Sequence, residues 1–410
     1  MTPATMLQQI TDYANRADPY PLYAELRKTP VARQDDGTYV VSTYREIHAL
    51  LHDPRISSDL RNRVHREGDP LPVAETTGLP PTLIKLDPPE HDRLRRQAMR
   101  PFGPPHTPRR VDDLHGELAE ISATLIDGLM GRDRIDIVED FAYPFPVTVI
   151  CRVLGVPRED EPRFHGWADA IVASIDPSPE QDPGERQRGG QQATVQIGQY
   201  MAGLIEERRR RPREDMLSGL VHDGGPEGRM STVDVITNSV LLLIAGHETT
   251  VNLITNGMLT LLRSPDTLER LRRDPDLMPQ AVEELLRYEP PIQLLPQRTP
   301  LSDVEVAGVT IPEGAPLTLV LAAGSRDPDR FRDPDLFDPE REDNQHFGFG
   351  SGIHSCFGAP LARLEVQLAL NQLIHRVESP RLVEDPPPYR RNPILRGPRH
   401  LLVECAAVTS

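Results

Sequence analysis

The stretch FGFGSGIHSCFG, from Phe347 to Gly358, is the most informative part of this sequence. It places Cys356 in a loop of closely spaced glycines, directly before the segment 359–370, which has Pro360 in the first turn of a predicted helix. Backbone N–H groups in such a loop can point at the sulfur, stabilise a thiolate and tune a bound metal. The alternative is an unreactive buried cysteine, because free cysteine is among the most buried residue types.

A long helix is predicted from near Ser231 to about Arg263. Ser231 and Asp234 have the spacing of a capping box, and the helix stops at Ser264-Pro265. Its middle reads Ala-Gly-His-Glu-Thr-Thr over residues 245–250, between two apolar runs. Four consecutive polar side chains in a buried helix need partners or a cavity. The glycine adds a weakness of about 1 kcal/mol relative to alanine.

The spacing of apolar residues predicts mostly helix for the rest of the chain. Apolar residues recur at helical spacing in 111–129, 192–211 and 267–288, and short strand-like runs lie at 39–42, 304–309 and 317–321. A turn signature, Pro312-Glu313-Gly314, separates the last two runs, and 176–192 is predicted to be a surface loop between two helices. We therefore predict a mainly α fold with small peripheral β-sheets.

Composition limits the kinds of partner. The 410 residues contain 46 basic and 62 acidic side chains, a formal net charge of −16, which disfavours binding to nucleic acid. No stretch has the apolar length needed to cross a bilayer, so no membrane association is expected. Three distant cysteines make no disulfide framework and fit a reducing compartment. We therefore expect a cytoplasmic protein.

Four residues of the glycine-rich loop match a known signature: Phe349, Gly352, Cys356 and Gly358. The pattern is a Phe, two residues, a Gly, three residues, the Cys, one residue and a Gly. This is the haem-binding signature of the cytochrome P450 family, and the chain resembles the soluble bacterial members of that family over essentially its whole length.

The resemblance implies the family's fold, a triangular prism with a long central helix over haem b, built here by residues 1–410 as a single domain. Cys356 would be the ligand of the haem iron, and a thiolate ligand favours cleavage of the O–O bond. The further cofactor-binding positions outside the propionate contacts would be Phe349, Gly350, Gly358 and Ala245.

The polar segment 245–250 is similar to the family's oxygen-activation motif. By this resemblance the helix opens at Gly246 over the iron, Thr249 hydrogen-bonds bound dioxygen, and Glu248 relays protons from solvent. A placed hydroxyl and a nearby acid suit the protonation that lets the O–O bond break. The alternative is that Thr249 and Thr250 bond back to helix carbonyls. His247 is expected to be a packing or surface residue.

Cationic side chains are expected around the two haem propionates. The resemblance assigns this role to His91 and Arg95, which lie one helical turn apart, to Arg298, and to His354, two residues before the cysteine. Each of these taken alone is more often an ordinary surface residue.

Glu284 and Arg287 share a predicted helix face, and Arg341 ends the stretch Phe-Asp-Pro-Glu-Arg, 337–341. Such Glu/Arg spacings are usually solvated. The resemblance instead implies that the three residues form a buried triad that supports the haem loop and has no catalytic role.

The implied activity is that of a monooxygenase, an oxidoreductase that inserts one oxygen atom from O2 into a small molecule by hydroxylation or epoxidation. No fused flavin or iron–sulfur domain is expected within 410 residues, so electrons would come from a separate ferredoxin and ferredoxin reductase. A basic patch could dock an acidic ferredoxin, although a solvated helix face explains it equally well. The patch consists of Arg93, Arg96, Arg100, Arg109 and Arg110.

By family position the substrate pocket is expected from 60–84, Ile244, Ala245 and 292–295. These residues are mainly aliphatic, so an apolar or amphipathic substrate is predicted. Fatty acids, terpenoids or steroids, and macrolide-like compounds all stay open.

Other readings of the same residues are a peroxygenase of the same fold and a non-catalytic haem sensor. The intact pair Glu248 and Thr249 counts against both. A zinc site formed by His346, His354 and Cys356 lacks a convincing fourth ligand.

Overall fold

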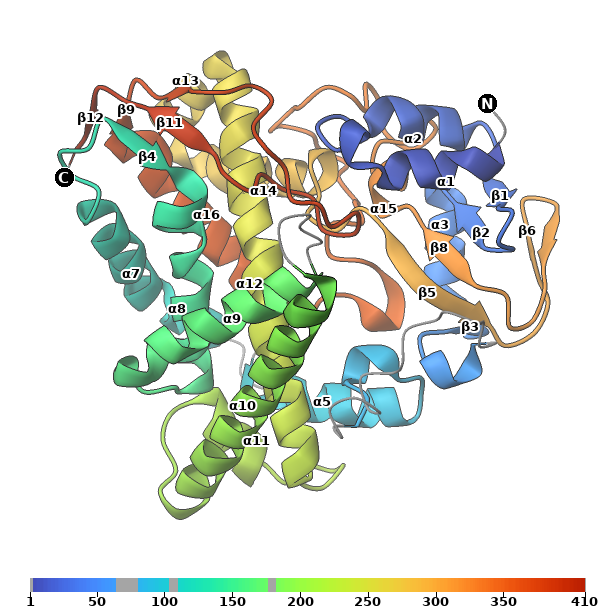
Figure 1. Cartoon of the computed structure of the whole chain (residues 1–410), viewed down its shortest axis with the longest axis horizontal. Helices are drawn as coiled ribbons and strands as arrows, with labels where there is room; N and C mark the ends of the chain where they lie inside the picture. Colours follow the sequence, from blue (N-terminus) through green and yellow to red (C-terminus); the bar gives the residue numbers. More distant parts are fainter. Residues whose placement is uncertain (1–2, 64–79, 103–109, 176–181, 410) are drawn as a thin grey trace.

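The computed structural model describes residues 3–63, 80–102, 110–175 and 182–409. Helices dominate and gather on one side of the molecule, while the largest sheet lies on the other side with the N-terminal helices (Figure 1). The predicted mainly α class with small sheets is therefore confirmed. The α-helices are α1 (Pro3–Thr11), α2 (Tyr20–Arg27), α3 (Tyr44–His52), α5 (Glu90–Phe102), α6 (Arg110–Asp113), α7 (His115–Asp127), α8 (Pro144–Leu154), α9 (Glu161–Ile175), α10 (Pro183–Arg210), α11 (Met216–His222), α12 (Thr232–Arg263), α13 (Pro265–Arg273), α14 (Met278–Tyr288), α15 (Leu321–Gly324) and α16 (Ala359–Arg376).

The strands of the described residues form small sheets. The largest has the order β1-β2-β8-β5-β3, in which β2 and β8 run parallel and the other neighbours antiparallel. The others are β10-β11-β4, β12-β9 and the hairpin β6-β7. The strands are β1 (Val31–Arg33), β2 (Tyr39–Val41), β3 (Ile56–Ser57), β4 (Arg134–Asp136), β5 (Leu295–Pro300), β6 (Val304–Val306), β7 (Val309–Ile311), β8 (Leu317–Leu319), β9 (Val377–Glu378), β10 (Arg381–Leu382), β11 (Leu402–Glu404) and β12 (Ala407–Val408).

Helix α12 runs through the middle of the molecule and packs against α8, α10 and α16 (Figure 1). Its predicted start is confirmed, because the Ser231 hydroxyl accepts a hydrogen bond from the Asp234 N–H at 3.1 Å. The expected opening at Gly246 is not seen, since 232–263 is one continuous α-helix. Buried apolar residues on both sides of the polar segment, such as Leu243 and Val251, hold the helix in place.

Two predicted helices are divided. The segment 267–288 forms α13 and α14, separated by a short 3-10 turn at Pro275–Leu277, because proline cannot donate the next helical hydrogen bond. The segment 111–129 begins with α6, breaks at Leu114 and continues as α7.

The predicted loop 176–192 is wrong over its second half. Helix α10 begins at Pro183, and the Asp182 carboxylate caps it by accepting from the Glu185 N–H at 2.8 Å. Residues 176–181 lie outside the described residues. The predicted strand 304–309 is also interrupted, because Ala307 and Gly308 have φ values of 49° and 76° and turn the chain between β6 and β7.

The main hydrophobic core unites the central helices. It includes residues of α8, α12, α14 and α16, and smaller clusters lie under the largest sheet and under the N-terminal helices. In the part of the chain that the structure describes, no helix is both long and apolar enough to span a bilayer. The fold thus brings α12 and the start of α16 to the glycine-rich loop, where residues of both helices line one cavity.

Candidate active site

A cavity of about 440 Å³ lies between α12 and the loop that carries Cys356. It is lined by residues of α12 between 241 and 253, by the loop 347–358, and by the segment 291–298. The predicted lining residues that reach it are Leu83, Ile84, Ala245, Ile292, Leu294 and Leu295. Ile244 is not among the lining residues, and 64–79 lies outside the described residues.

Cys356 presents its accessible surface to this cavity. Its N–H donates to the Phe349 carbonyl at 2.9 Å, which closes the loop. Gly352 is required there, because its φ is +69° and a Cβ would lie 2.1 Å from the Leu51 carbonyl oxygen. Burial raises the pKa of the Cys356 thiol, whereas the N–H groups of Gly358 and its neighbour and the charge of Arg95 oppose that rise. A bound metal ion would complete the stabilisation of a thiolate here.

The four predicted propionate contacts gather beside this cysteine. Arg95, Arg298 and His354 line the cavity, and the His91 ring lies behind His354 with 4.4 Å between ring centroids. The Arg95 guanidinium donates to the Ser355 carbonyl at 2.7 Å and ties α5 to the loop.

Several ring nitrogens of this basic cluster have no partner in the part of the protein that the structure describes, although His91 Nδ1 lies 2.8 Å from the Asp92 carboxylate. His91 Nε2 and both ring nitrogens of His354 have no hydrogen-bond partner among the described residues, and Arg298 is only 7% exposed. Burial, then His91, Arg298, Arg95 and Lys85, lower the pKa of His354 to about 3. Unpartnered donors in a buried cationic cluster suit a ligand that carries carboxylates, so the residues present fit the two propionates of haem.

The remaining predicted cofactor contacts also face the cavity. Ala245 lines it from α12, and Phe349, Gly350 and Gly358 line it from the loop. A Cβ on Gly358 would lie 3.7 Å from the cysteine sulfur. The structure thus brings this part of the predicted set together around one thiol.

The two predicted oxygen-activation residues are separated. Thr249 lines the cavity, and its hydroxyl donates to the Ala245 carbonyl at 2.7 Å, which is the back-bonding alternative. Glu248 is buried and is not among the lining residues. Its Oε1 lies 3.0 Å from Nε of the buried Arg390 and accepts a hydrogen bond from Asn252 at 3.3 Å. The acid is therefore held away from the cavity by an ion pair.

His247 is a packing residue, as expected. Its ring meets Tyr143 edge to face at 4.4 Å between centroids, and it is 2% exposed. Burial and the nearby charge of Arg390 lower the pKa of His247 to about 3, so the ring is neutral at physiological pH. Glu248 and Thr249 thus have polar partners of their own, whereas His247 Nε2 has no hydrogen-bond partner among the described residues.

The predicted structural triad is confirmed. Glu284 and Arg287 are both fully buried, with Oε1 of the acid 2.7 Å from the guanidinium, and Arg341 Nε lies 3.2 Å from the same carboxylate. Arg287 also donates to the carbonyls of Ser325, Pro334 and Leu336. The triad joins α14 to the segment that leads into the haem loop.

Two charged residues that line the cavity escaped the sequence analysis. Glu365 of α16 is fully buried with its pKa raised well above the ordinary value by burial, and Lys85 carries a cation into the apolar wall. The available signal was a charged residue inside an apolar pattern, as in Leu-Ile-Lys-Leu over 83–86. Arg390 gave no such signal, because its partner is distant in sequence.

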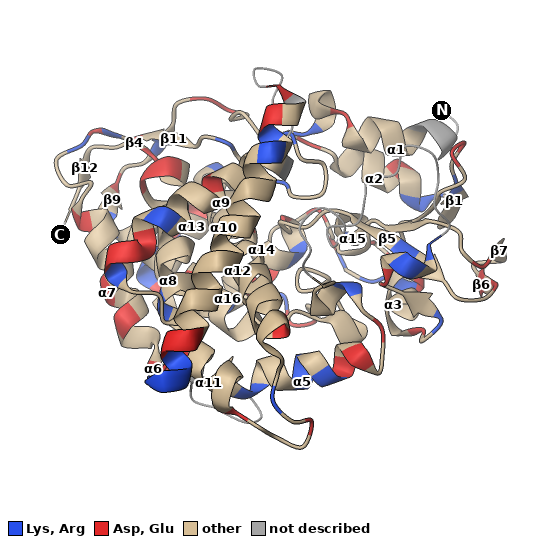
Figure 2. Cartoon of the chain, turned by 60° about the horizontal axis from the view of Figure 1, so that its bottom comes forward, with Lys and Arg blue, Asp and Glu red and all other residues tan. Residues whose placement is uncertain are grey.

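The predicted basic patch is largely neutralised where it is described. Arg96 pairs with Glu227 at 2.7 Å, Arg100 with Asp223 at 3.1 Å, and Arg93 lies 4.0 Å from an aspartate of α12. Figure 2 shows both charge colours along α5. Arg109 and the side chain of Arg110 lie outside the described residues.

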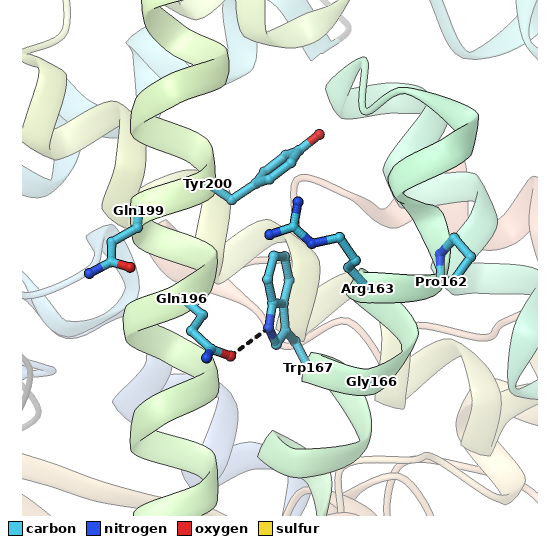
Figure 3. A pocket seen from close by; sticks show the side chains of 7 residues that line it. All are labelled: Pro162, Arg163, Gly166, Trp167, Gln196, Gln199 and Tyr200. Atoms are coloured by element: carbon cyan, nitrogen blue, oxygen red, sulfur yellow. Dashed lines mark hydrogen bonds between the residues drawn. The ribbon is translucent and has the colours of Figure 1, made fainter.

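An open hollow between α9 and α10 is unrelated to this cavity (Figure 3). The Arg163 guanidinium lies over the rings of Trp167 and Tyr200, 5.0 and 5.1 Å from their centroids. The Trp167 N–H donates to the Gln196 side chain at 2.8 Å. Because these side chains interact with one another, we assign the chemistry to the cavity at Cys356 and not to this hollow. Within the described residues no three metal-binding side chains cluster, which leaves the zinc reading without support.

Comparison with known proteins agrees with this site. The family model named Cytochrome P450 matches residues 78–404. The chain is 40% identical to cytochrome P450 monooxygenase PikC of Streptomyces venezuelae, over 93% of this chain and 89% of that protein. It is 36% identical to 6-deoxyerythronolide B hydroxylase of Saccharopolyspora erythraea, over 94% of this chain and 96% of that protein. The structure of CYP109Q5 from Chondromyces apiculatus matches with a TM-score of 0.87 and 33% identity, covering 98% of both chains. The chain therefore belongs to the cytochrome P450 family, whose members bind haem b.

Proposed function

We propose that this chain inserts one oxygen atom of O2 into an apolar or amphipathic small molecule, with electrons from a separate ferredoxin and its reductase. The observation that carries the proposal is that Cys356 and Thr249 line one largely apolar cavity, from the loop and from α12 respectively. The similar proteins named above include a monooxygenase and a hydroxylase, which supports the same reaction class.

Each residue has a distinct task in this proposal. Haem b bound through Cys356 supplies the activation of O2. Arg298 and His354, with His91 and Arg95, would hold the haem carboxylates by charge-assisted hydrogen bonds. The aliphatic lining would bind the substrate and exclude water.

The Thr249 hydroxyl donates to the Ala245 carbonyl and can still accept a hydrogen bond, so it would hold a water in the cavity where a proton is needed. Glu248 would take up a proton from solvent once its side chain leaves Arg390, and would pass that proton to this water.

The electron donor and the cellular location are part of the proposal. The ferredoxin would dock near α5, whose arginines Arg93, Arg96 and Arg100 retain acidic partners. Replacing Arg96 and Arg100 by glutamate should slow reduction by ferredoxin several-fold at low salt, as stopped-flow absorbance would measure. Unchanged rates would remove this docking site. The reducing compartment inferred from three unpaired cysteines favours the cytoplasm.

The test begins with the absorption spectrum of the purified protein, reduced with dithionite and exposed to carbon monoxide. We expect a strongly red-shifted Soret band that is absent in Cys356→Ala. Product formation is then compared with O2 plus reductase and with hydrogen peroxide alone. Turnover with peroxide alone would identify a peroxygenase, and haem binding without turnover of any ligand that changes the spin state would identify a sensor.

A further inference from the structure

Lys85 places a cation in the wall of the active-site cavity. It ends a 3-10 turn, Leu83–Lys85, and lines the same cavity as Cys356 and Thr249. The chain contains two lysines, and the other, Lys28, is 71% exposed at its side chain. The lysine in the cavity wall is therefore unusual within this chain as well as within an apolar lining.

The ammonium group of Lys85 has no carboxylate partner among the described residues. Its Nζ donates to the Gln297 side-chain oxygen at 2.7 Å, which leaves donors for a further acceptor. Burial, and then the charge of Arg298, lower the pKa of Lys85 to about 8. A partly buried cation with a neutral partner costs free energy that an anionic ligand would recover.

Gln297 is held in a conformation that serves this contact. Its φ is +65°, in the left-handed region that a residue with a side chain rarely adopts. Strained residues of this kind concentrate at binding sites, where the surrounding structure fixes them. Gln297 lines the cavity together with Lys85, so the strained residue and the cation form one polar corner of an apolar space.

The corner adds positive charge beyond what the cofactor requires. Arg95 and Arg298 already offer two guanidinium groups for the two haem carboxylates, with His91 and His354 as further donors. Lys85 instead follows directly on Leu83 and Ile84, which line the cavity as substrate-pocket residues. A third full cation on that wall points to an anion other than the cofactor.

We propose that Lys85, held by Gln297, anchors a carboxylate at one end of an otherwise apolar chain-like substrate. The inference rests on the proposed monooxygenase function and narrows its substrate from apolar molecules in general to amphipathic acids. The aliphatic residues Leu294 and Leu295 would contact the apolar part of such a molecule.

Ligand-induced spin-state titration of the holoenzyme near pH 7 tests this directly. The probes are the straight-chain acids from decanoic to hexadecanoic acid, each compared with its methyl ester. The wild type should bind at least one acid about tenfold more tightly than its ester. Lys85→Gln should weaken binding of that acid on the order of ten- to a hundredfold, the value of a charged hydrogen bond, and leave the ester nearly unchanged. Lys85→Arg should restore acid binding in part, and Lys28→Gln is the matched control without effect.

A second readout needs no change in the haem spectrum. Reductive methylation with 13C-formaldehyde labels just two lysines and the amino terminus, and Lys28→Arg assigns the signals. The acid that binds should shift the NMR resonance of dimethylated Lys85, and its methyl ester should leave that resonance in place.

The outcomes separate this inference from the proposed function. Equal binding of acids and esters in the wild type and in Lys85→Gln, or no binding of any acid of the series, overturns the anchor. Loss of haem on purification of Lys85→Gln, as expected for Arg298→Gln, with an unchanged preference for the acid would assign Lys85 to the cofactor and also overturn it. A wild type without the carbon monoxide band would instead defeat the proposed function itself.

Discussion

Glu284 supports the haem loop through two arginines, and its removal should destabilise the whole protein. Its carboxylate receives Arg287 and Arg341, and it also accepts from the Asp338 N–H at 3.0 Å and from the Asn344 amide at 3.1 Å. In Glu284→Ala the fully buried Arg287 keeps its charge and loses its counter-ion. We therefore expect a loss of stability rather than a local rearrangement.

The magnitude follows from burial. Removing one partner of a buried ion pair costs about 3–5 kcal/mol, because the other charge stays uncompensated. Arg287 keeps three backbone carbonyl acceptors, so the lower end, about 3 kcal/mol, is expected. That is a large part of the roughly 5–15 kcal/mol that holds a typical domain folded.

Urea unfolding of the holoenzyme, followed by circular dichroism and by Soret absorbance, measures this loss. Glu284→Gln keeps the shape and should fall between the wild type and Glu284→Ala. Glu25→Ala, which breaks an exposed pair with Lys28, is the matched control and should change stability by less than about 1 kcal/mol. Coincident unfolding curves for Glu284→Ala and the control would refute the argument that the triad supports the loop.

Two further predictions concern stability in acid and the coupling of O2 consumption to product formation. Burial tends to raise the pKa of Glu283, but hydrogen bonds from His346 and Arg363 prevail and lower it from 4.5 to about 2. A carboxyl with a depressed folded-state pKa stabilises the protein above its unfolded pKa, so this contribution is lost as pH falls from about 4.5 toward 2. Unfolding measured from pH 6 to pH 3 should show a shallower loss in Glu283→Gln, by about 1–2 kcal/mol, and parallel curves would contradict it. Thr249→Ala should keep the carbon monoxide band but release roughly tenfold more of the consumed O2 as hydrogen peroxide, because the cavity loses its hydroxyl. If the variant and the wild type form the same amount of product per NADPH consumed, the only role of Thr249 is the structural hydrogen bond to Ala245.

The glycine-rich loop shows how much of the site could be predicted from sequence. The residues of this loop adopt unusual backbone conformations or approach other backbone segments closely. Both situations require glycine, and glycine is visible in the sequence. Gly352 is an example, since its positive φ and its closeness to Leu51 exclude any side chain. The spacing also placed Glu284 and Arg287 on one helix face, but the prediction that the pair is buried came from the family resemblance. The fold class and these two features were therefore predicted correctly.

Partners that come from distant parts of the chain were not predictable from spacing. Lys85 and Gln297 are more than two hundred residues apart in the sequence, and no local sequence pattern predicts their hydrogen bond. The start of α10, residues 183–191, was missed because composition rich in Gly and Gln favours a loop, whereas a capping aspartate and Pro183 were enough to start the helix. The basic patch was also overstated, because the acids that pair with α5 are distant in sequence. Asp223 and Glu227 lie between α11 and α12, and Asp234 lies in α12.

The segment 245–250 shows where sequence and geometry must be combined. An unbroken α-helix turns by about 100° per residue, so only part of its surface can face the cavity. Thr249 and Thr250 lie on that part, whereas Glu248 is not among the lining residues and instead meets Arg390. The acid and the hydroxyl are thus adjacent in sequence but divided by the helix. Proton transfer between them requires either a rotation of the Glu248 side chain away from Arg390 or a local opening of α12. Arg390→Met would release Glu248 from this ion pair at little change in volume. A changed pH dependence of product formation in that variant would show that protons pass through the Glu248 carboxyl, and an unchanged one that they take another route.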